Sequence, residues 1–206
     1  MFALVESGSI TKYFSGNQGF TLGGNKYPKA VFTLWTKSER EAIGIYEIEI
    51  NNSKKKNEKW YINTDVTYSF GSGKVTGSYG DATAKAHAHA LFTAQDESDG
   101  KGTEGEVKTE GLKTKLIRNV KAKANTLLSI TDWYVTRKTE KSTAIPSNIT
   151  TWRNGIRSKQ AAMETSITNA NDTPALETLY TYVNTADEGD PPVMERPLGE
   201  FPELGS

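Results

Sequence analysis

The sequence contains no cysteine and only two histidines among its 206 residues. It therefore has no disulfide framework, no thiolate zinc site, no iron–sulfur cluster and no cysteine nucleophile. No stretch approaches the roughly 20 apolar residues that a membrane-spanning helix needs. The formal net charge is zero, from 25 Lys+Arg and 25 Asp+Glu, which argues against a generally basic nucleic-acid binder. We therefore expect neither a membrane nor a nucleic acid as a partner.

The charges are unevenly distributed along the chain, although they sum to zero. Residues 1–100 are balanced, residues 101–141 carry a net charge of +5, and residues 142–171 carry +2. Residues 172–206 carry −7. Opposite charges of this kind attract each other within one chain or between copies. Two interpretations stay open: solvated faces of a helix and a tail, or a polarity used for docking during assembly.

The first half of the sequence is typical of short strands separated by turns. Gly8 lies in a polar loop between two β-prone runs, which indicates a hairpin. Thr36 and Glu39 have the spacing of a capping box, so we expect a short helix over 37–43. The predicted strands are 2–5, 10–14, 30–35, 45–50, 60–62, 66–70 and 74–79. This pattern predicts a small antiparallel β-rich domain over residues 1–95.

A change of composition separates the two halves of the chain. Residues 82–92 are rich in alanine and favour a helix. The stretch that follows combines acidic residues with three glycines, Gly100, Gly102 and Gly105. Such a composition is typical of a loop or linker. We therefore place a Gly-rich, acidic linker at residues 96–109.

The second half has the apolar spacing of amphipathic helices. Pro146 stands where a helix of about 25 residues begins, since proline in a first turn has no amide to leave unpaired. Asp172 is placed to cap a further helix. The apolar stripes of the two longer helices are Leu112, Leu116, Val120, Leu127 and Leu128, and then Ile149, Trp152, Ile156, Met163 and Ile167. These patterns predict a helical, helix-hairpin domain over residues 110–185.

The last predicted part is an extended proline-rich tail over residues 186–206. Four prolines fall within twelve residues of it: Pro191, Pro192, Pro197 and Pro202. Proline fixes φ and removes amide donors, which favours an extended chain. The tail also carries apolar side chains, among them Met194, Leu198 and Phe201. We therefore expect the tail to lie in a groove, on its own helices or on a neighbouring molecule. The whole sequence predicts a protein of α+β class.

Residue patterns that would carry catalysis or hold a cofactor are scarce. His87 and His89 would share a face only in a strand, and no acidic residue stands at ligand spacing beside them. The acidic stretch 96–100 departs from the register of a calcium-binding EF-hand loop. The serines lack a Gly-x-Ser-x-Gly elbow, and Gly71-Ser72-Gly73 lacks the lysine of a phosphate loop. We expect no enzyme activity, no cofactor and no metal site.

Two stretches in the helical half resemble a known group of proteins. They are Thr131-Asp132-Trp133-Tyr134-Val135-Thr136-Arg137-Lys138, and Thr143-Ala144-Ile145-Pro146 followed by Thr151-Trp152-Arg153-Asn154-Gly155-Ile156-Arg157. Together they resemble a DWYVxRxxExGTAIPxxVxxYRxAxR pattern of bacteriophage tail-fibre and tail-fibre-assembly-type proteins. The ending Arg196-Pro197-Leu198-Gly199-Glu200-Phe201-Pro202 also looks like this group. Most of the resemblance lies within residues 110–204.

The resemblance implies a non-enzymatic protein of the phage virion, in the tail, fibre or baseplate region. It would be assembled in the host cytoplasm and would dock onto other tail or fibre proteins or onto copies of itself. Two alternatives stay open: a fibre-assembly chaperone absent from the mature virion, and a receptor-binding, glycan-binding module. The candidate interaction residues are Trp133, Tyr134, Trp152, Arg153, Arg157, Met194, Leu198 and Phe201.

Overall fold

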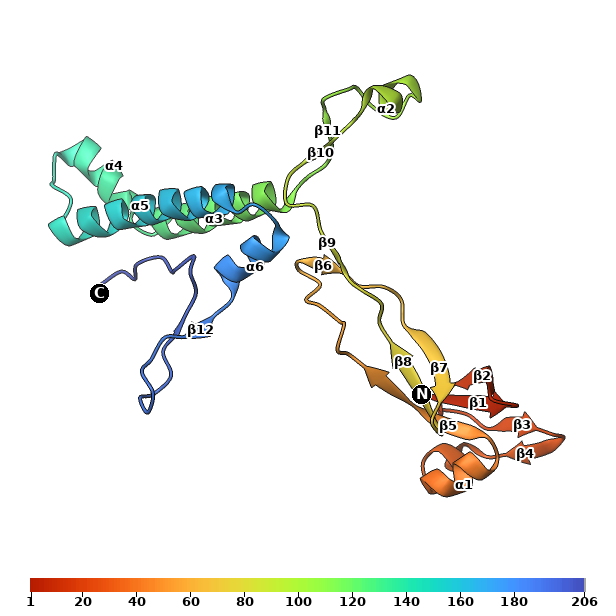
Figure 1. Cartoon of the computed structure of the whole chain (residues 1–206). Coiled ribbons are helices and arrows are strands. Elements are labelled where there is room, and N and C mark those ends of the chain that lie inside the picture. The colour runs from red at the N-terminus through yellow and green to blue at the C-terminus, as the bar shows by residue number, and fades with distance from the viewer. Residues whose placement is uncertain (206) are drawn as a thin grey trace. The chain divides into compact units, whose positions relative to one another are not determined.

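The computed structural model describes residues 1–205 and divides the chain into two compact units. The first unit is Met1–Thr83, and the second begins at Ala84. The first is built mainly of strands and the second mainly of helices (Figure 1). The expected α+β class is confirmed at this level. Residues 96–109 belong to the second unit.

A five-stranded sheet forms the framework of the first unit, in the order β2-β1-β5-β8-β7. Most neighbours are antiparallel, but β5 and β8 run parallel, with Ile48 opposite Val75. The expectation of a purely antiparallel domain is therefore wrong. The bounds are β1 Phe2–Glu6, β2 Ser9–Phe14, β5 Ile45–Asn51, β7 Thr67–Gly71 and β8 Lys74–Ser78. Residues 52–73, which include β7, supply the long connection that a parallel neighbour requires.

Close packing within the β7–β8 hairpin depends on Gly77. A Cβ atom at Gly77 would lie 2.8 Å from Ile50 Cδ1 and 2.8 Å from Tyr68 Cε1. Any larger residue would push the side chains of β5 and β7 apart, because such a contact is far inside van der Waals distance. Tyr13 of β2 and Tyr68 of β7 lie with ring centroids 5.2 Å apart, although their strands stand at opposite edges of the sheet. The sheet is therefore curled.

One face of the sheet packs against the turns and the short helix that connect its strands. Its buried core is Phe2, Leu4, Phe32 and Ile45. The covering elements are β3 Phe20–Leu22, β4 Asn25–Tyr27, a 3₁₀ helix at Lys29–Phe32 and α1 Lys37–Ala42. The strand expected at 30–35 is therefore wrong. Pro28 precedes a helical turn in which the Pro28 carbonyl accepts from the Val31 amide at 3.2 Å.

The capping box at the start of α1 is confirmed. The Glu39 amide donates to Thr36 Oγ1 at 3.3 Å, and the Thr36 amide donates to the Glu39 carboxylate at 2.8 Å. The Glu39 carboxylate accepts hydrogen bonds first from the Thr36 amide and then from the Thr36 hydroxyl, and these two bonds hold the pKa of Glu39 below its ordinary value. The sequence signal was sufficient here because both partners lie within four residues of each other.

Residues 82–109 form strands and a short helix. β9 is Thr83–Ala84 and pairs with β6 (Tyr61–Ile62), and β10 Ala90–Leu91 pairs with β11 Val107–Thr109. The helix expected over 82–92 is therefore wrong, because strand pairing with distant residues overrides the helix propensity of alanine. Between β10 and β11, where a linker was expected, α2 (Ala94–Ser98) is capped by Thr93 and Asp96.

Two long helices form the body of the second unit. α3 (Leu112–Ser129) and α5 (Ser147–Asn169) lie side by side, and α4 (Asp132–Lys141) connects them at one end (Figure 1). α6 (Thr173–Tyr180) follows, and the Asp172 carboxylate accepts from the Ala175 amide at 2.7 Å, which confirms the predicted cap. Buried side chains of the two stripes include Leu116, Val120, Ile149, Trp152, Ile156, Met163 and Ile167.

After α6 the chain forms a short hairpin before it returns to the helices. β12 (Val183–Asn184) pairs with β13 (Met194–Glu195), so part of the stretch expected to be an extended tail is a hairpin. From Leu198 onward the chain lies on its own helices, since Leu198 is buried and Phe201 packs against the α3–α5 core. Residue 206 of the expected tail lies outside the described residues.

Candidate protein-docking site

Arg153 of α5 contacts the turn that joins α3 to α4. Its side chain is buried on α5, and its Nη1 donates to the Leu128 carbonyl at 2.8 Å and to Thr131 Oγ1 at 2.8 Å. The same nitrogen forms an ion pair with Asp132 at 2.9 Å. Arg153 therefore fixes the end of α3 and the start of α4 against α5. It positions α4 and has little surface for a partner to contact.

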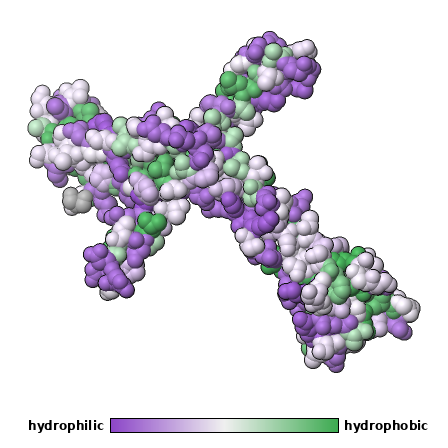
Figure 2. Space-filling view, viewed as in Figure 1, coloured by the Kyte–Doolittle hydropathy of each residue, from purple (hydrophilic) through white to green (hydrophobic). Residues whose placement is uncertain are grey.

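The α4 helix itself has an exposed surface of mixed apolar and basic character. None of its ten residues is buried, and Trp133 is 52% exposed. Ile130, just before the helix, is 57% exposed. We define the α4 patch as Ile130, Trp133, Arg137, Lys138 and Lys141. Apolar side chains gathered at α4 are visible in the space-filling view (Figure 2).

Arg137 shapes the aromatic part of the α4 patch. Its guanidinium carbon lies 4.8 Å from the ring centroid of Trp133 and 5.1 Å from that of Tyr134. Arginine over an aromatic face is an attractive arrangement. Within the described residues, the buried Nε of Arg137 has no hydrogen-bond partner. The guanidinium of Arg137 therefore holds the aromatic pair in place, while its Nε stays buried beneath the surface.

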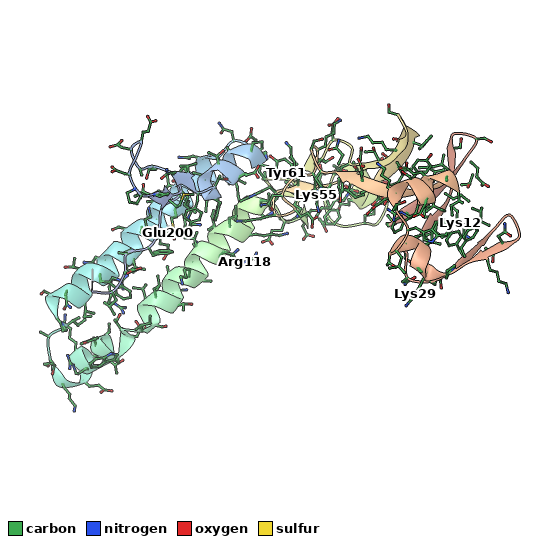
Figure 3. All side chains as sticks on the ribbon, turned by 90° about the horizontal axis from the view of Figure 1, so that it is seen from below. Lys12, Lys29, Lys55, Tyr61, Arg118 and Glu200 are labelled. Atoms are coloured by element: carbon green, nitrogen blue, oxygen red, sulfur yellow. The ribbon has the colours of Figure 1, made fainter. Side chains whose placement is uncertain are left out.

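The C-terminal segment 196–205 crosses the helices and borders a groove. Trp152 Nε1 donates to the Pro202 carbonyl at 2.9 Å, and a Cβ at Gly155 would lie 3.3 Å from Pro202 Cγ. The groove has a volume of about 580 Å³. Its walls include Val120, Lys123, Leu127, Trp152, Met163, Arg196, Phe201 and Leu204. Figure 3 labels Glu200, where this segment lies beside the helices.

Arg196 organises the start of that segment. Its Nε lies 2.7 Å from a Glu200 carboxylate oxygen, and its guanidinium carbon lies 5.4 Å from the ring centroids of both Tyr180 and Tyr182. Burial raises the pKa of Tyr180. The Tyr182 hydroxyl donates to Glu200, and this hydrogen bond raises the pKa of Tyr182. The segment is therefore held by both polar and apolar contacts.

The structure separates the eight candidate interaction residues into two groups. Exposed on the surface are Trp133, Arg157 and Met194. Buried or half-buried are Tyr134, Trp152, Arg153, Leu198 and Phe201. The second group holds the unit together and the first is available to a partner. Sequence reasoning missed the exposed apolar side chains of Tyr182 and Val183, because residues up to 185 were assigned to the helical domain.

His89 has structural partners in the second unit. His89 Nδ1 accepts from the Gly111 amide at 3.4 Å, and its Nε2 lies 2.9 Å from Thr114 Oγ1. Asp96 forms an ion pair with Lys108 at 2.8 Å. Across residues 1–205, nowhere do three or more His, Cys, Asp or Glu side chains gather in a way that would hold a metal ion. In the same range, no helix combines the length and apolar character needed to cross a membrane.

Comparisons with protein families, with curated proteins and with solved structures found no match to this chain. The geometry of its own residues therefore carries the functional argument. That geometry provides an exposed helix held by a buried arginine, a groove beside the C-terminal segment, and an exposed hairpin.

Proposed function

We propose that this chain is a non-enzymatic structural protein of a phage tail, in the fibre or baseplate region, that works by docking onto other proteins. One observation carries the proposal: α4 exposes Trp133 and its neighbours, yet the buried Arg153 holds the helix in place. A helix that is fixed and still exposes apolar surface is typical of a contact site. Tryptophan and arginine are also the residues that contribute most at protein interfaces.

The division into two units supports an adaptor. We propose that the β-rich unit and the helical unit, with the C-terminal segment on its helices, are separate docking bodies. Each contains its own buried cluster: Phe2, Leu4, Phe32 and Ile45 in the first, and Ala124, Trp152 and Ile156 in the second. A chain with two such bodies can connect two neighbours in an assembly. The resemblance of residues 131–138 and 143–157 to the tail-fibre group agrees with this role.

The proposal is tested by a protein census of purified particles of the phage that encodes this chain. We expect quantitative mass spectrometry to find the chain at a fixed copy number per particle. A Trp133→Glu substitution should reduce its incorporation, since it places a charge in the α4 patch. Ser158→Glu on the exposed side of α5 is the matched control and should incorporate normally.

Absence of the chain from mature particles would contradict the proposal. If the chain instead co-purified with a fibre protein before assembly, the assembly chaperone would be the correct function. Binding of the isolated chain to host glycans would favour the receptor-binding module.

A further inference from the structure

The β12–β13 hairpin is an ordered projection with an apolar base and an acidic tip. Its strands pair Val183 with Glu195 and Asn184 with Met194. Asn184 Oδ1 accepts from the amides of Ala186 and Val193, at 3.2 Å and 2.9 Å, which fixes the loop. About half of each of four apolar side chains is exposed: Tyr182, Val183, Val193 and Met194. In Figure 2 an apolar area at this hairpin adjoins a hydrophilic tip.

Over the part of the chain that the structure describes, the acidic residues of this hairpin form no ion pair with a basic side chain. They are Asp187, Glu188, Asp190 and Glu195. An exposed acidic loop is well solvated and does not by itself indicate a contact. Exposed apolar side chains lie directly beside this loop, and the combination is typical of a contact surface.

The α4 patch has the complementary composition. Its apolar residues are Ile130 and Trp133, and its basic residues are Arg137, Lys138 and Lys141. Asp132 is neutralised by Arg153 at 2.9 Å, so Glu140 is the remaining acid on the helix. Over the described residues, Lys138 and Lys141 take part in no ion pair. The hairpin and the patch thus pair apolar surface with apolar surface, and acidic side chains with basic ones.

Within one chain the two surfaces do not meet through polar contacts. No hydrogen bond or ion pair described for residues 1–205 joins the hairpin to α4. Figure 1 shows the hairpin and α4 as separate projections from the helical unit. Their complementary surfaces are therefore free to meet between molecules.

We infer that the β12–β13 hairpin of one copy docks onto the α4 patch of a second copy. This inference rests on the proposed function and names one partner for the α4 patch. The contact joins two different surfaces, so it is head-to-tail, and repeating it generates a ring or an open filament. The acidic and basic side chains steer the two copies together, and Trp133 and Met194 supply the apolar contact.

The test is sedimentation of the purified full-length chain by analytical ultracentrifugation. We expect concentration-dependent association that weakens with added salt, because exposed charges are screened. A patch variant, Lys138→Glu with Lys141→Glu, should weaken association about tenfold or more. A hairpin variant, Asp187→Lys with Glu188→Lys, should do the same.

Mixing the two charge-reversed variants tests whether the hairpin and the patch contact each other directly. Mixing the two double variants places a basic hairpin opposite an acidic patch, and an acidic hairpin opposite a basic patch. We expect the mixture to associate although neither variant does so alone. The control carries Lys26→Glu and Lys29→Glu, two exposed lysines of the first unit, and should behave like the unaltered chain. Circular dichroism verifies that every variant is folded.

Three results would overturn the inference: a monomer at every concentration up to about 1 mM, association that neither double variant weakens, or loss without restoration in the mixture. Failure here is distinguishable from failure of the proposed function. A monomer that is nevertheless found in purified particles would reject only the contact between copies. A self-associating chain that is absent from particles would reject only the virion role.

Discussion

Ser142 ends α4 with φ at 54°, in the left-handed region that side chains with a Cβ rarely adopt. Glycine has no steric penalty in this conformation, whereas other residues lose roughly 1–2 kcal/mol there. Ser142 is therefore held in a conformation that glycine would adopt without strain.

We predict that Ser142→Gly stabilises the helical unit by about 0.5–1 kcal/mol, because the left-handed conformation becomes unstrained while the unfolded chain gains some entropy. Ser158→Gly, in the middle of α5, is the matched control and should destabilise by a similar amount. Urea denaturation followed by circular dichroism measures both. Equal effects of the same sign would show that φ at Ser142 is not the cause.

The contacts of Arg153 could be predicted from the sequence only in part. Two of its acceptors belong to residues 131 and 132, but the third is the backbone carbonyl of Leu128. A carbonyl acceptor leaves no trace in the amino-acid sequence. Arg153 could thus be chosen as an interaction candidate from its place in the pattern. Its burial and its positioning of α4 can be recognised only in the folded structure.

At the scale of elements, predictions succeeded where the signal was local. The helices at α3, α5 and α6 follow from apolar spacing, proline and the Asp172 cap, all within single segments. The prediction for residues 82–109 was wrong because the partners of the strands in this region are distant in sequence. In the candidate site, the aromatic residues of α4 were found from the pattern. Of the exposed base of the β12–β13 hairpin, only Met194 was chosen, since Tyr182 and Val183 fell within the predicted helical domain and Val193 within the predicted tail.

The α2 element carries a pH-dependent contact. The Lys108 side chain, followed by hydrogen bonds from Thr93, lowers the pKa of Asp96 to about 2. A carboxylate whose pKa is depressed on folding stabilises the fold above its unfolded pKa, ordinarily about 3.8. That stabilisation is lost as the pH falls through the folded value. The affected window therefore runs from about pH 4 down to about pH 2.

We predict that the cap of α2 opens within this acid window. Amide hydrogen exchange at Thr93 and Asp96 should accelerate as the pH falls from about 4 to about 2, beyond the intrinsic change. Asp96→Asn should expose the same amides already at pH 7 and remove most of the additional pH dependence. Unchanged protection at pH 2 would contradict the role of this carboxylate.

At the scale of the whole molecule, the two units have separate hydrophobic clusters. Ile45 is fully buried in the first and Ile156 in the second. The same substitution can therefore be made in each. Shortening either isoleucine to alanine leaves a cavity and costs about 2–5 kcal/mol.

We predict that Ile45→Ala lowers the unfolding temperature of the β-rich unit alone, and that Ile156→Ala lowers that of the helical unit alone. Calorimetry, with tryptophan fluorescence as a second probe, should resolve the two transitions. Each variant serves as the control for the other. A single transition that moves equally in both variants would show that the chain unfolds as one cooperative body.

The parallel pairing of β5 with β8 has a kinetic consequence. A parallel neighbour cannot be reached through a tight turn, so residues 52–73 must close a loop before Ile48 meets Val75. By contrast, β7 and β8 are joined by Ser72 and Gly73, both at positive φ, in a turn that forms within microseconds. The hairpin should therefore assemble first and join β5 afterwards. The docking of a preformed hairpin, more than the formation of any strand, then sets the folding time of the first unit.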